Sequence, residues 1–197
     1  MNRIHLALIP ALLLGILTII FFASFSRSSE VTVAFAQSTH TTSPAGAAAT
    51  QLTPPVPSAG CQVSSRFPAK VRQWCSWIDQ FAGPLHLDSS LIAAVMWLES
   101  GGNPTAYSKS GAVGLMQVMP RDGLAASFQC KNGPCFAARP SMDELYDPQF
   151  NISYGVRMLA GLLESTGSLR EALRRYGPMD VEYTYADRVL KIYESYR

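Results

Sequence analysis

The chain has 197 residues, of which 48% are hydrophobic and 15% are charged, and its formal net charge is +2. The Lys and Arg residues are scattered through the sequence and form no basic patch, which argues against nucleic-acid binding. The sequence has no Gly-rich phosphate loop and no pair of His residues at metal-ligand spacing, so we expect no cofactor and no metal.

The first 36 residues are predicted to direct export. Residues 6–23 are almost wholly apolar, and as a helix they would span roughly 27 Å, close to the thickness of a bilayer core. Ala34-Phe35-Ala36 has the small-x-small form of a signal-peptidase site, but a polar gap separates it from an unusually long apolar run. The sequence leaves open whether residues 1–36 are a cleaved signal peptide or a retained membrane anchor. Either way, we expect the rest of the chain to be extracytoplasmic.

Residues 37–60 are predicted to be a tether. They are rich in Ser, Thr, Ala, Gly and Pro and contain no acidic residue, Lys or Arg. Such a segment buries too little apolar surface to order itself, and its root-mean-square reach is roughly 25–30 Å. Residues 61–197 remain, which is enough for one compact domain.

Four cysteines, all in residues 61–197, predict two disulfides in an oxidising compartment. Four cysteines allow three pairings, and the sequence alone does not choose among them. Local loop closure favours Cys61–Cys75 and Cys130–Cys135. A zinc site is the weaker alternative, because no CxxC-like pair is present.

Apolar residues at helical spacing predict an all-α domain. The expected helices cover residues 69–82, 89–98, 148–165, 168–176 and 181–196, with a helical turn at 114–119 and an irregular excursion at 129–140. Asp147-Pro148 is a typical helix start, and Gly83-Pro84 and Gly177-Pro178 are typical stops. No segment alternates convincingly as a strand.

Glu99 is the strongest candidate for catalysis. It ends an apolar helix that Asp88 or Ser89 can cap, and it precedes a turn rich in Gly and Pro. Desolvation beside Trp97 and Leu98 would raise the pKa of this carboxyl, which suits a general acid in glycosidic cleavage. The alternative is a Glu that helps to terminate a helix and faces water.

The segment from Glu99 to Pro120 reads ESGGNPTAYSKSGAVGLMQVMP. It closely resembles the soluble lytic transglycosylase (SLT) domain, a goose-lysozyme-like fold within glycoside hydrolase family 23. The resemblance extends more weakly from about Val71 to Tyr196. It implies a lysozyme-like helical domain that cleaves the β-1,4 bond between N-acetylmuramic acid and N-acetylglucosamine. The expected partners are therefore peptidoglycan glycan strands, and the membrane if the N-terminal segment is retained; we expect a monomer.

The resemblance also implies a set of site residues. Glu99 falls on the family's catalytic acid, and the matching substrate-binding positions are Ser108, Ser110, Met116, Gln117, Asn151, Tyr176 and Tyr185. Every binding residue except Gln117 also has a structural interpretation. Ser108 and Ser110 could be loop polar groups, Met116 core filling, and Asn151 a support of the neighbouring backbone; Tyr176 and Tyr185 could be helix-packing aromatics. Where the family commonly has Ala-Tyr-Asn-x-Gly, this chain reads Arg175-Tyr176-Gly177-Pro178, so the Tyr is present and the Asn is not. The Cys130–Cys135 excursion is also outside the common pattern.

The resemblance implies a mechanism with one carboxylate. Glu99 would protonate the glycosidic oxygen and then accept the proton of the muramic 6-hydroxyl, which closes a 1,6-anhydro ring. Two alternatives stay open. A hydrolase of lysozyme or chitinase type would need a positioned water and a second acid. A non-catalytic module would bind peptidoglycan without turnover.

Overall fold

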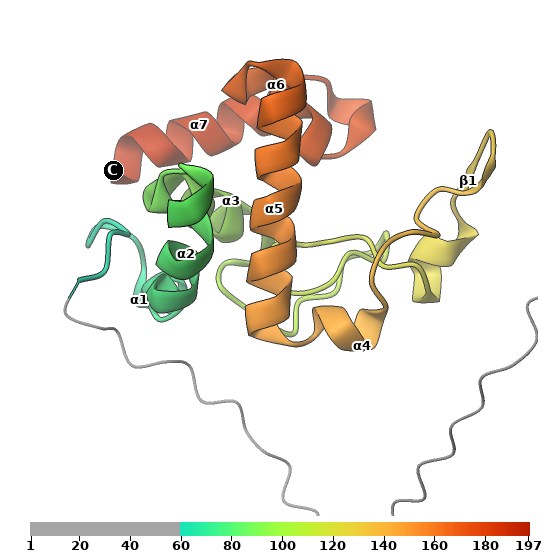
Figure 1. Ribbon diagram of the computed structural model, residues 1–197, viewed down its shortest axis with the longest axis horizontal. Coiled ribbons are helices and arrows are strands. Elements are labelled where there is room, and N and C mark those ends of the chain that lie inside the picture. The colour runs from blue at the N-terminus through green and yellow to red at the C-terminus, as the bar shows by residue number, and fades with distance from the viewer. Residues whose placement is uncertain (1–59) are drawn as a thin grey trace, which may run out of the picture. The chain divides into compact units, whose positions relative to one another are not determined.

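The computed structural model describes residues 60–197, and these form a mostly helical domain (Figure 1), as the sequence predicts. The expected export segment and all of the tether except Gly60 lie outside the described residues. The α-helices are α1 (Ala69–Arg72), α2 (Cys75–Ala82), α3 (Ser89–Ser100), α4 (Met142–Leu145), α5 (Pro148–Thr166), α6 (Leu169–Tyr176) and α7 (Thr184–Tyr196). Three 3₁₀ turns, η1 (Gly83–Leu85), η2 (Gly123–Ser127) and η3 (Met179–Val181), and the antiparallel strands β1 (Gln129–Cys130) and β2 (Gly133–Pro134) complete the elements.

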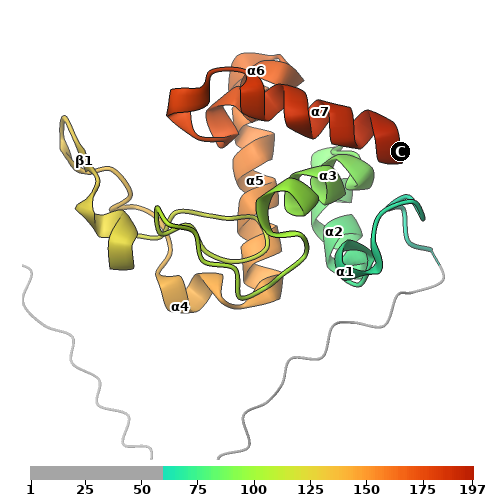
Figure 2. The same cartoon turned by 180° about the vertical axis from the view of Figure 1, so that it is seen from behind.

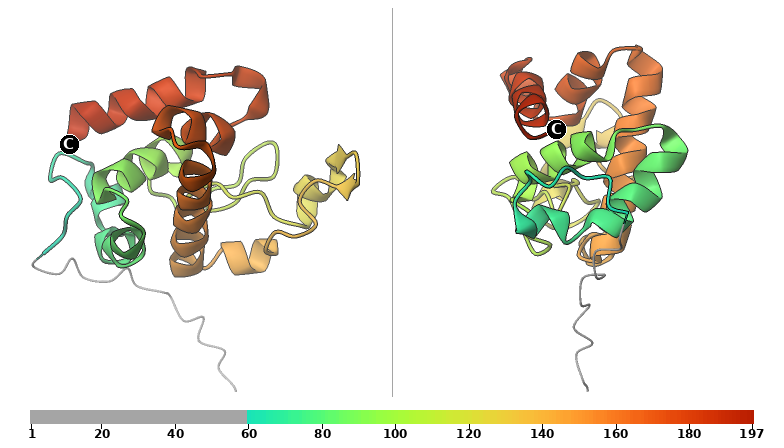
Figure 3. Two further views of the ribbon diagram at one scale, coloured as in Figure 1. Left: turned by 45° about the horizontal axis from the view of Figure 1, so that its top comes forward. Right: turned by 90° about the vertical axis from the view of Figure 1, so that its left-hand side faces the viewer.

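Helix α3 is the centre of the core. Its residues from Ser89 to Met96 are all buried, because α1, α2 and α7 pack around it. The long helix α5 packs against α2 and α6, and α7 runs across the top of the domain (Figures 1 and 3). Asp88 caps α3 by accepting a hydrogen bond from the Ser90 amide at 2.7 Å, and Gly101 ends the helix in a left-handed conformation. The helix therefore stops directly after Glu99 and Ser100.

The helix expected over residues 69–82 is broken between Arg72 and Cys75. Trp74 lies at the break, and its side chain is almost fully buried. Its indole Nε1 donates a hydrogen bond to the Gly102 carbonyl at 3.1 Å. Because this contact joins residues distant in the sequence, the local apolar pattern could not reveal the break.

Three further elements differ from the expectation. Residues 114–119 form no helical turn; Val113 instead pairs with Val118 in an antiparallel bridge that closes a tight turn. Helix α4 was not expected, although Ser141 and Glu144 form a capping box that marks its start. The last helix begins at Thr184 rather than near Val181.

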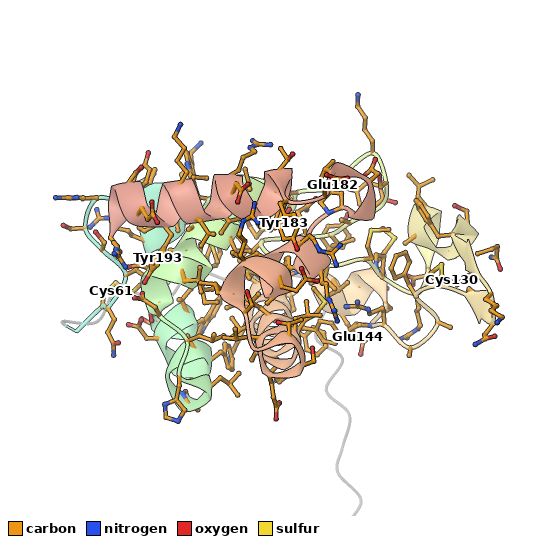
Figure 4. The ribbon with its side chains drawn as sticks, turned by 90° about the horizontal axis from the view of Figure 1, so that it is seen from above. Cys61, Cys130, Glu144, Glu182, Tyr183 and Tyr193 are labelled. Carbon is orange, nitrogen blue, oxygen red and sulfur yellow. A yellow bond between two sulfur atoms is a disulfide. The ribbon has the colours of Figure 1, made fainter. Side chains whose placement is uncertain are left out.

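Both disulfides have the locally closed pairing, Cys61–Cys75 and Cys130–Cys135. The first joins the segment before α1 to the start of α2, and the second closes the β1–β2 hairpin. Cys61, Cys75 and Asp79 bring possible metal ligands together, but both sulfurs are bonded to each other and are not available to zinc. Cys61 and Cys130 lie at opposite ends of the domain (Figure 4).

Within residues 60–197, no helix combines the length and the apolar character that a membrane crossing requires.

Candidate active site

Glu99 occupies the last turn of α3 and is partly buried. Burial raises the pKa of its carboxyl to about 7, and the hydroxyl of Tyr185 opposes this rise by donating a hydrogen bond to Oε1 at 2.5 Å. Burial is the larger of these two effects. A carboxyl with this pKa can both donate and accept a proton near neutral pH.

Two stacked tyrosines form one side of the Glu99 environment. Tyr185 of α7 is 7% exposed, and its ring lies 6.4 Å from that of Tyr176, which ends α6. The Tyr176 hydroxyl donates to the Met116 carbonyl at 2.8 Å. Burial raises the pKa of both phenols well above 10, and the nearby charge of Glu99 raises them further. Both hydroxyls therefore stay protonated and act as donors.

Asn151 of α5 supports the turn from Val113 to Val118 through hydrogen bonds. The Asn151 amide donates to the carbonyls of Val113 and Leu145 at 2.9 and 2.8 Å, and its Oδ1 accepts from the Met116 amide at 2.8 Å. Gly114 has φ +78°, and a Cβ there would collide with the Asn151 amide. Asn151 is fully buried. The Asn151 side chain therefore supports this turn and the end of α4, and its contact with substrate stays a prediction.

Met116 is also buried. Its side chain packs against Gly155 of α5, where a Cβ would collide with it, so Met116 fills the core, and its role in lining a cleft stays a prediction. Its carbonyl nevertheless anchors Tyr176. The next residue, Gln117, is partly buried, and its Nε2 donates to the carbonyls of Gly114 and Ala106 at 2.9 and 3.2 Å. Neither bond uses the Gln117 Oε1.

The two expected serines lie in the loop between α3 and the turn, which runs from the end of α3 toward the hairpin (Figure 2). Ser108 is partly buried, and its Oγ accepts a hydrogen bond from the Ala112 amide at 2.9 Å, which leaves its hydroxyl proton free to donate. Ser110 is exposed. Ser108 and Ser110 are therefore reachable by a ligand, unlike Asn151 and Met116.

Ser100 is a supporting residue to which the sequence analysis gave no role. Its hydroxyl donates to the Leu115 carbonyl at 2.8 Å and accepts from the Gly102 amide at 3.2 Å. These bonds tie the end of α3 to the turn at 113–118 and so fix the backbone beside Glu99. Its position directly after the candidate acid was the one signal that could have identified it.

The departure from the family pattern near Tyr176 has a steric explanation. Gly177 stands where the family commonly has Asn, and it lies so close to the Tyr185 ring that any side chain there would collide with it. The two preceding arginines bind Glu171: Arg174 at 2.6 Å and Arg175 at 3.0 Å. They therefore stabilise α6 on its outer side.

Comparison with known proteins agrees with this geometry. The Transglycosylase SLT domain family matches residues 77–181, which include Glu99 and the turn at 113–118. The chain belongs to this family. The chain is also similar to several proteins that are named lytic murein transglycosylases.

Membrane-bound lytic murein transglycosylase E of Buchnera aphidicola is 32% identical over 128 residues, covering 64% of this chain and 57% of that protein. Membrane-bound lytic murein transglycosylase C of Glaesserella parasuis is 30% identical over 135 residues, covering 68% of this chain and 36% of that protein. Endo-type membrane-bound lytic murein transglycosylase A of Klebsiella pneumoniae is 36% identical over 91 residues, covering 46% of this chain and 43% of that protein. The matches thus span between about one third and three fifths of the length of these relatives.

Proposed function

We propose that this chain is a lytic transglycosylase that cleaves the β-1,4 bond between N-acetylmuramic acid and N-acetylglucosamine in peptidoglycan. In this proposal the protonated Glu99 donates its proton to the glycosidic oxygen as the bond to C1 breaks. The resulting carboxylate accepts the proton of the muramic 6-hydroxyl, whose oxygen bonds to C1. The product is a 1,6-anhydro ring, and no water is consumed.

The observation that carries the proposal is the environment of Glu99. A carboxyl with a pKa of about 7 is divided between acid and base at neutral pH, and one residue must play both roles in this mechanism. A hydrolase with two catalytic carboxylates needs a second carboxyl within about 10 Å. The pKa of Glu99 is raised by burial, and the one side-chain hydrogen bond given to its carboxyl within residues 60–197 comes from Tyr185 rather than from a second carboxyl. Membership in the SLT family supports the same assignment.

We assign supporting roles to five further side chains. Tyr185 would hold Glu99 and limit the rise of its pKa, and Gln117, Ser108 and Ser110 would orient the sugar and its acetamide. Tyr176 would act indirectly, through its stack on Tyr185 and its bond to the Met116 carbonyl.

The proposal extends to the organisation of the chain. Residues 1–36 would export the protein and either be removed or anchor it, residues 37–60 would be the tether, and residues 61–197 would form a lysozyme-like domain facing the wall. Two disulfides suit an oxidising, extracytoplasmic compartment. The relatives described as membrane-bound agree with a location near a membrane.

The direct test is to digest purified sacculi with the protein and to identify the products by mass spectrometry. We expect products with 1,6-anhydro ends, one water lighter than hydrolysed ones. We also expect Glu99→Gln to lower turnover by at least about 100-fold, because it removes the general acid and base. Glu164→Gln, at an exposed position of α5, is the matched control and should retain full activity.

Other outcomes would reject the proposal. Products with free reducing ends would identify a hydrolase, and retention on sacculi without products would identify a binding module. Full turnover by Glu99→Gln would remove Glu99 from the mechanism.

A further inference from the structure

The feature that the proposed function does not use is the loop from Asp122 to Pro140, here called the clipped loop. It leaves the body after the turn at 113–118, carries the Cys130–Cys135 hairpin and returns at α4 (Figures 1 and 2). Its last residues, Arg139 and Pro140, lie back against the helical body. The backbone of this return is fixed, because the Arg121 amide donates to the Pro140 carbonyl at 2.9 Å and the Arg121 guanidinium to the Arg139 carbonyl at 3.3 Å.

The Arg139 side chain packs on one face of α5. Its guanidinium carbon lies 5.9 Å from the centre of the Tyr154 ring, and the guanidinium contacts the Met158 sulfur one helical turn further along. The side chain is partly buried. Stacking on an aromatic ring and an apolar side chain holds a guanidinium in one orientation without neutralising it.

Arg139 has no anionic partner within residues 60–197, in contrast to several other arginines there. No carboxylate lies within salt-bridge distance of it. The arginines that do form ion pairs, at 2.6 to 3.3 Å, are Arg121, Arg170, Arg174 and Arg175. A guanidinium that is partly desolvated and preorganised, but has no counter-ion, is suited to bind one.

The position of Arg139 connects it to the candidate active site. Gly155, next to Tyr154 on α5, lies directly against the Tyr176 hydroxyl. The charge of Arg139 is close enough to Tyr176 to lower the pKa of that phenol against the effect of burial. Tyr176 stacks on Tyr185, and Tyr185 binds Glu99. The charge of Arg139 therefore acts on Tyr176 of the tyrosine stack, while burial and the Tyr185 hydrogen bond set the pKa of Glu99.

We infer that Arg139 is a specificity-determining residue that binds a carboxylate of the substrate. This inference rests on the proposed function, because it takes the substrate to be a peptidoglycan strand. A guanidinium binds a carboxylate through two parallel hydrogen bonds, and a lysine cannot reproduce this geometry. Peptidoglycan presents carboxylates in two places: on the lactyl group of a muramic residue without peptide, and on the stem peptide of a substituted one.

The test compares the full chain with Arg139→Gln and Arg139→Lys. The substrates are intact glycan strands with stem peptides and strands stripped of peptide by an amidase, and an N-acetylglucosamine oligomer without carboxylates serves as a ligand in binding measurements. We expect Arg139→Gln to raise KM about ten-fold or more on a strand that carries the bound carboxylate, since hydrogen bonds to charged groups have this magnitude. We expect kcat to stay within about two-fold, because Glu99 keeps its environment. Arg139→Lys keeps the positive charge, so its KM should lie between those of the unaltered chain and Arg139→Gln. This intermediate value also guards against a variant that fails to fold.

Lys131→Gln is the matched control. It removes one positive charge from the tip of the same clipped loop, where the side chain is exposed, and it should leave KM unchanged on both kinds of peptidoglycan strand. The N-acetylglucosamine oligomer should not distinguish Arg139→Gln from the unaltered chain. A larger effect on stripped strands would identify the lactyl carboxylate, and a larger effect on intact strands the stem peptide.

An unchanged KM for Arg139→Gln on both kinds of peptidoglycan strand would overturn the inference. Binding measured in a Glu99→Gln background keeps this result separate from the proposed function. If the unaltered chain makes no anhydro products, the proposed function fails. A ten-fold weaker binding of strands by the Arg139→Gln, Glu99→Gln double variant would still support the carboxylate site, and equal binding would reject it.

Discussion

At the scale of single residues, Glu99 is governed by two opposing effects. Burial disfavours its carboxylate, and the hydrogen bond from Tyr185 favours it. Burial is the larger effect, so the pKa stays near 7 rather than near 4.5. Tyr185 can keep this role over a wide pH range because its own pKa is raised well above 10.

We expect Tyr185→Phe to move the alkaline limb of the pH–rate profile to higher pH. The proposed first step needs protonated Glu99, so activity should decline as the pH rises through about 7 in the unaltered chain. Without the Tyr185 hydroxyl, the carboxylate loses a stabilising hydrogen bond and the pKa of Glu99 rises further. The profile of kcat/KM against pH measures the shift directly.

Tyr183→Phe is the control for this substitution. Its hydroxyl binds Glu171 at 2.8 Å and makes no bond to Glu99, so the alkaline limb should stay in place. Figure 4 shows Tyr183 near the start of α7, two residues before Tyr185. A limb that moves to lower pH in Tyr185→Phe would contradict the assigned role of the hydrogen bond.

The residues of the site differ in how far the sequence could predict them. The position of Glu99 followed from the apolar pattern of its helix and from the glycines after it. Asn151 and Met116 were expected to contact substrate, yet both are fully buried. Their residue types are compatible with either role, and only the fold decides, because the partners of Asn151 on Val113 and Met116 are 38 and 35 residues away.

At the scale of elements, three of the longer helices carry a start signal of their own and were predictable, whereas the short helix α4 was missed despite its capping box. Asp147, Ser168 and Asp88 each cap a helix by accepting a backbone hydrogen bond, as expected of these residue types. The break at Trp74 was not predicted; the hydrogen bond from the Trp74 indole to the Gly102 carbonyl joins residues that are 28 positions apart. The turn at 113–118 was mistaken for a helical turn for the same reason: Asn151 determines its shape from α5.

The two disulfides should stabilise the domain unequally. Loop-closure entropy predicts a loss of about 3 kcal/mol when Cys61 and Cys75 are both replaced by Ser, and at most about 2 kcal/mol for Cys130 and Cys135. The sequence separations are 14 and 5 residues, and Cys75 is fully buried whereas the β1 strand is exposed. Urea denaturation of the two double variants gives the comparison. An equal or reversed order would show that native contacts, rather than loop length, decide the effect.

At the scale of the whole molecule, folding brings the site together from segments far apart in the chain. Glu99 comes from α3, the supporting turn from residues 113–118, and the two tyrosines from the end of α6 and from α7. The core holds these pieces rigidly enough to keep a carboxyl partly out of water. This burial gives Glu99 its useful pKa, and it also disfavours the folded state whenever Glu99 is ionised.

We therefore expect Glu99→Gln to make the domain more stable at alkaline pH, while it abolishes activity. Glu99 has a pKa of about 7 in the folded chain, against an ordinary value of 4.5. Below pH 4.5 the carboxyl is protonated in both states, so it carries no penalty. Between pH 4.5 and 7 the folded state binds more protons than the unfolded state, and stability falls as the pH rises. The total loss is about 3 kcal/mol, because one pKa unit corresponds to about 1.4 kcal/mol.

The variant escapes this loss because Gln does not titrate, and its amide can still accept the Tyr185 hydrogen bond. Its stability advantage over the unaltered chain should be smallest near pH 4.5 and grow by about 3 kcal/mol toward pH 8. Urea denaturation of both proteins at several pH values measures this difference, in which the titration of all other groups cancels. Glu164→Gln, at an exposed position, should show no such growth. A pH-independent difference between Glu99→Gln and the unaltered chain would mean that the folded domain does not raise the pKa of Glu99, and the one-carboxylate mechanism would then lose its physical basis.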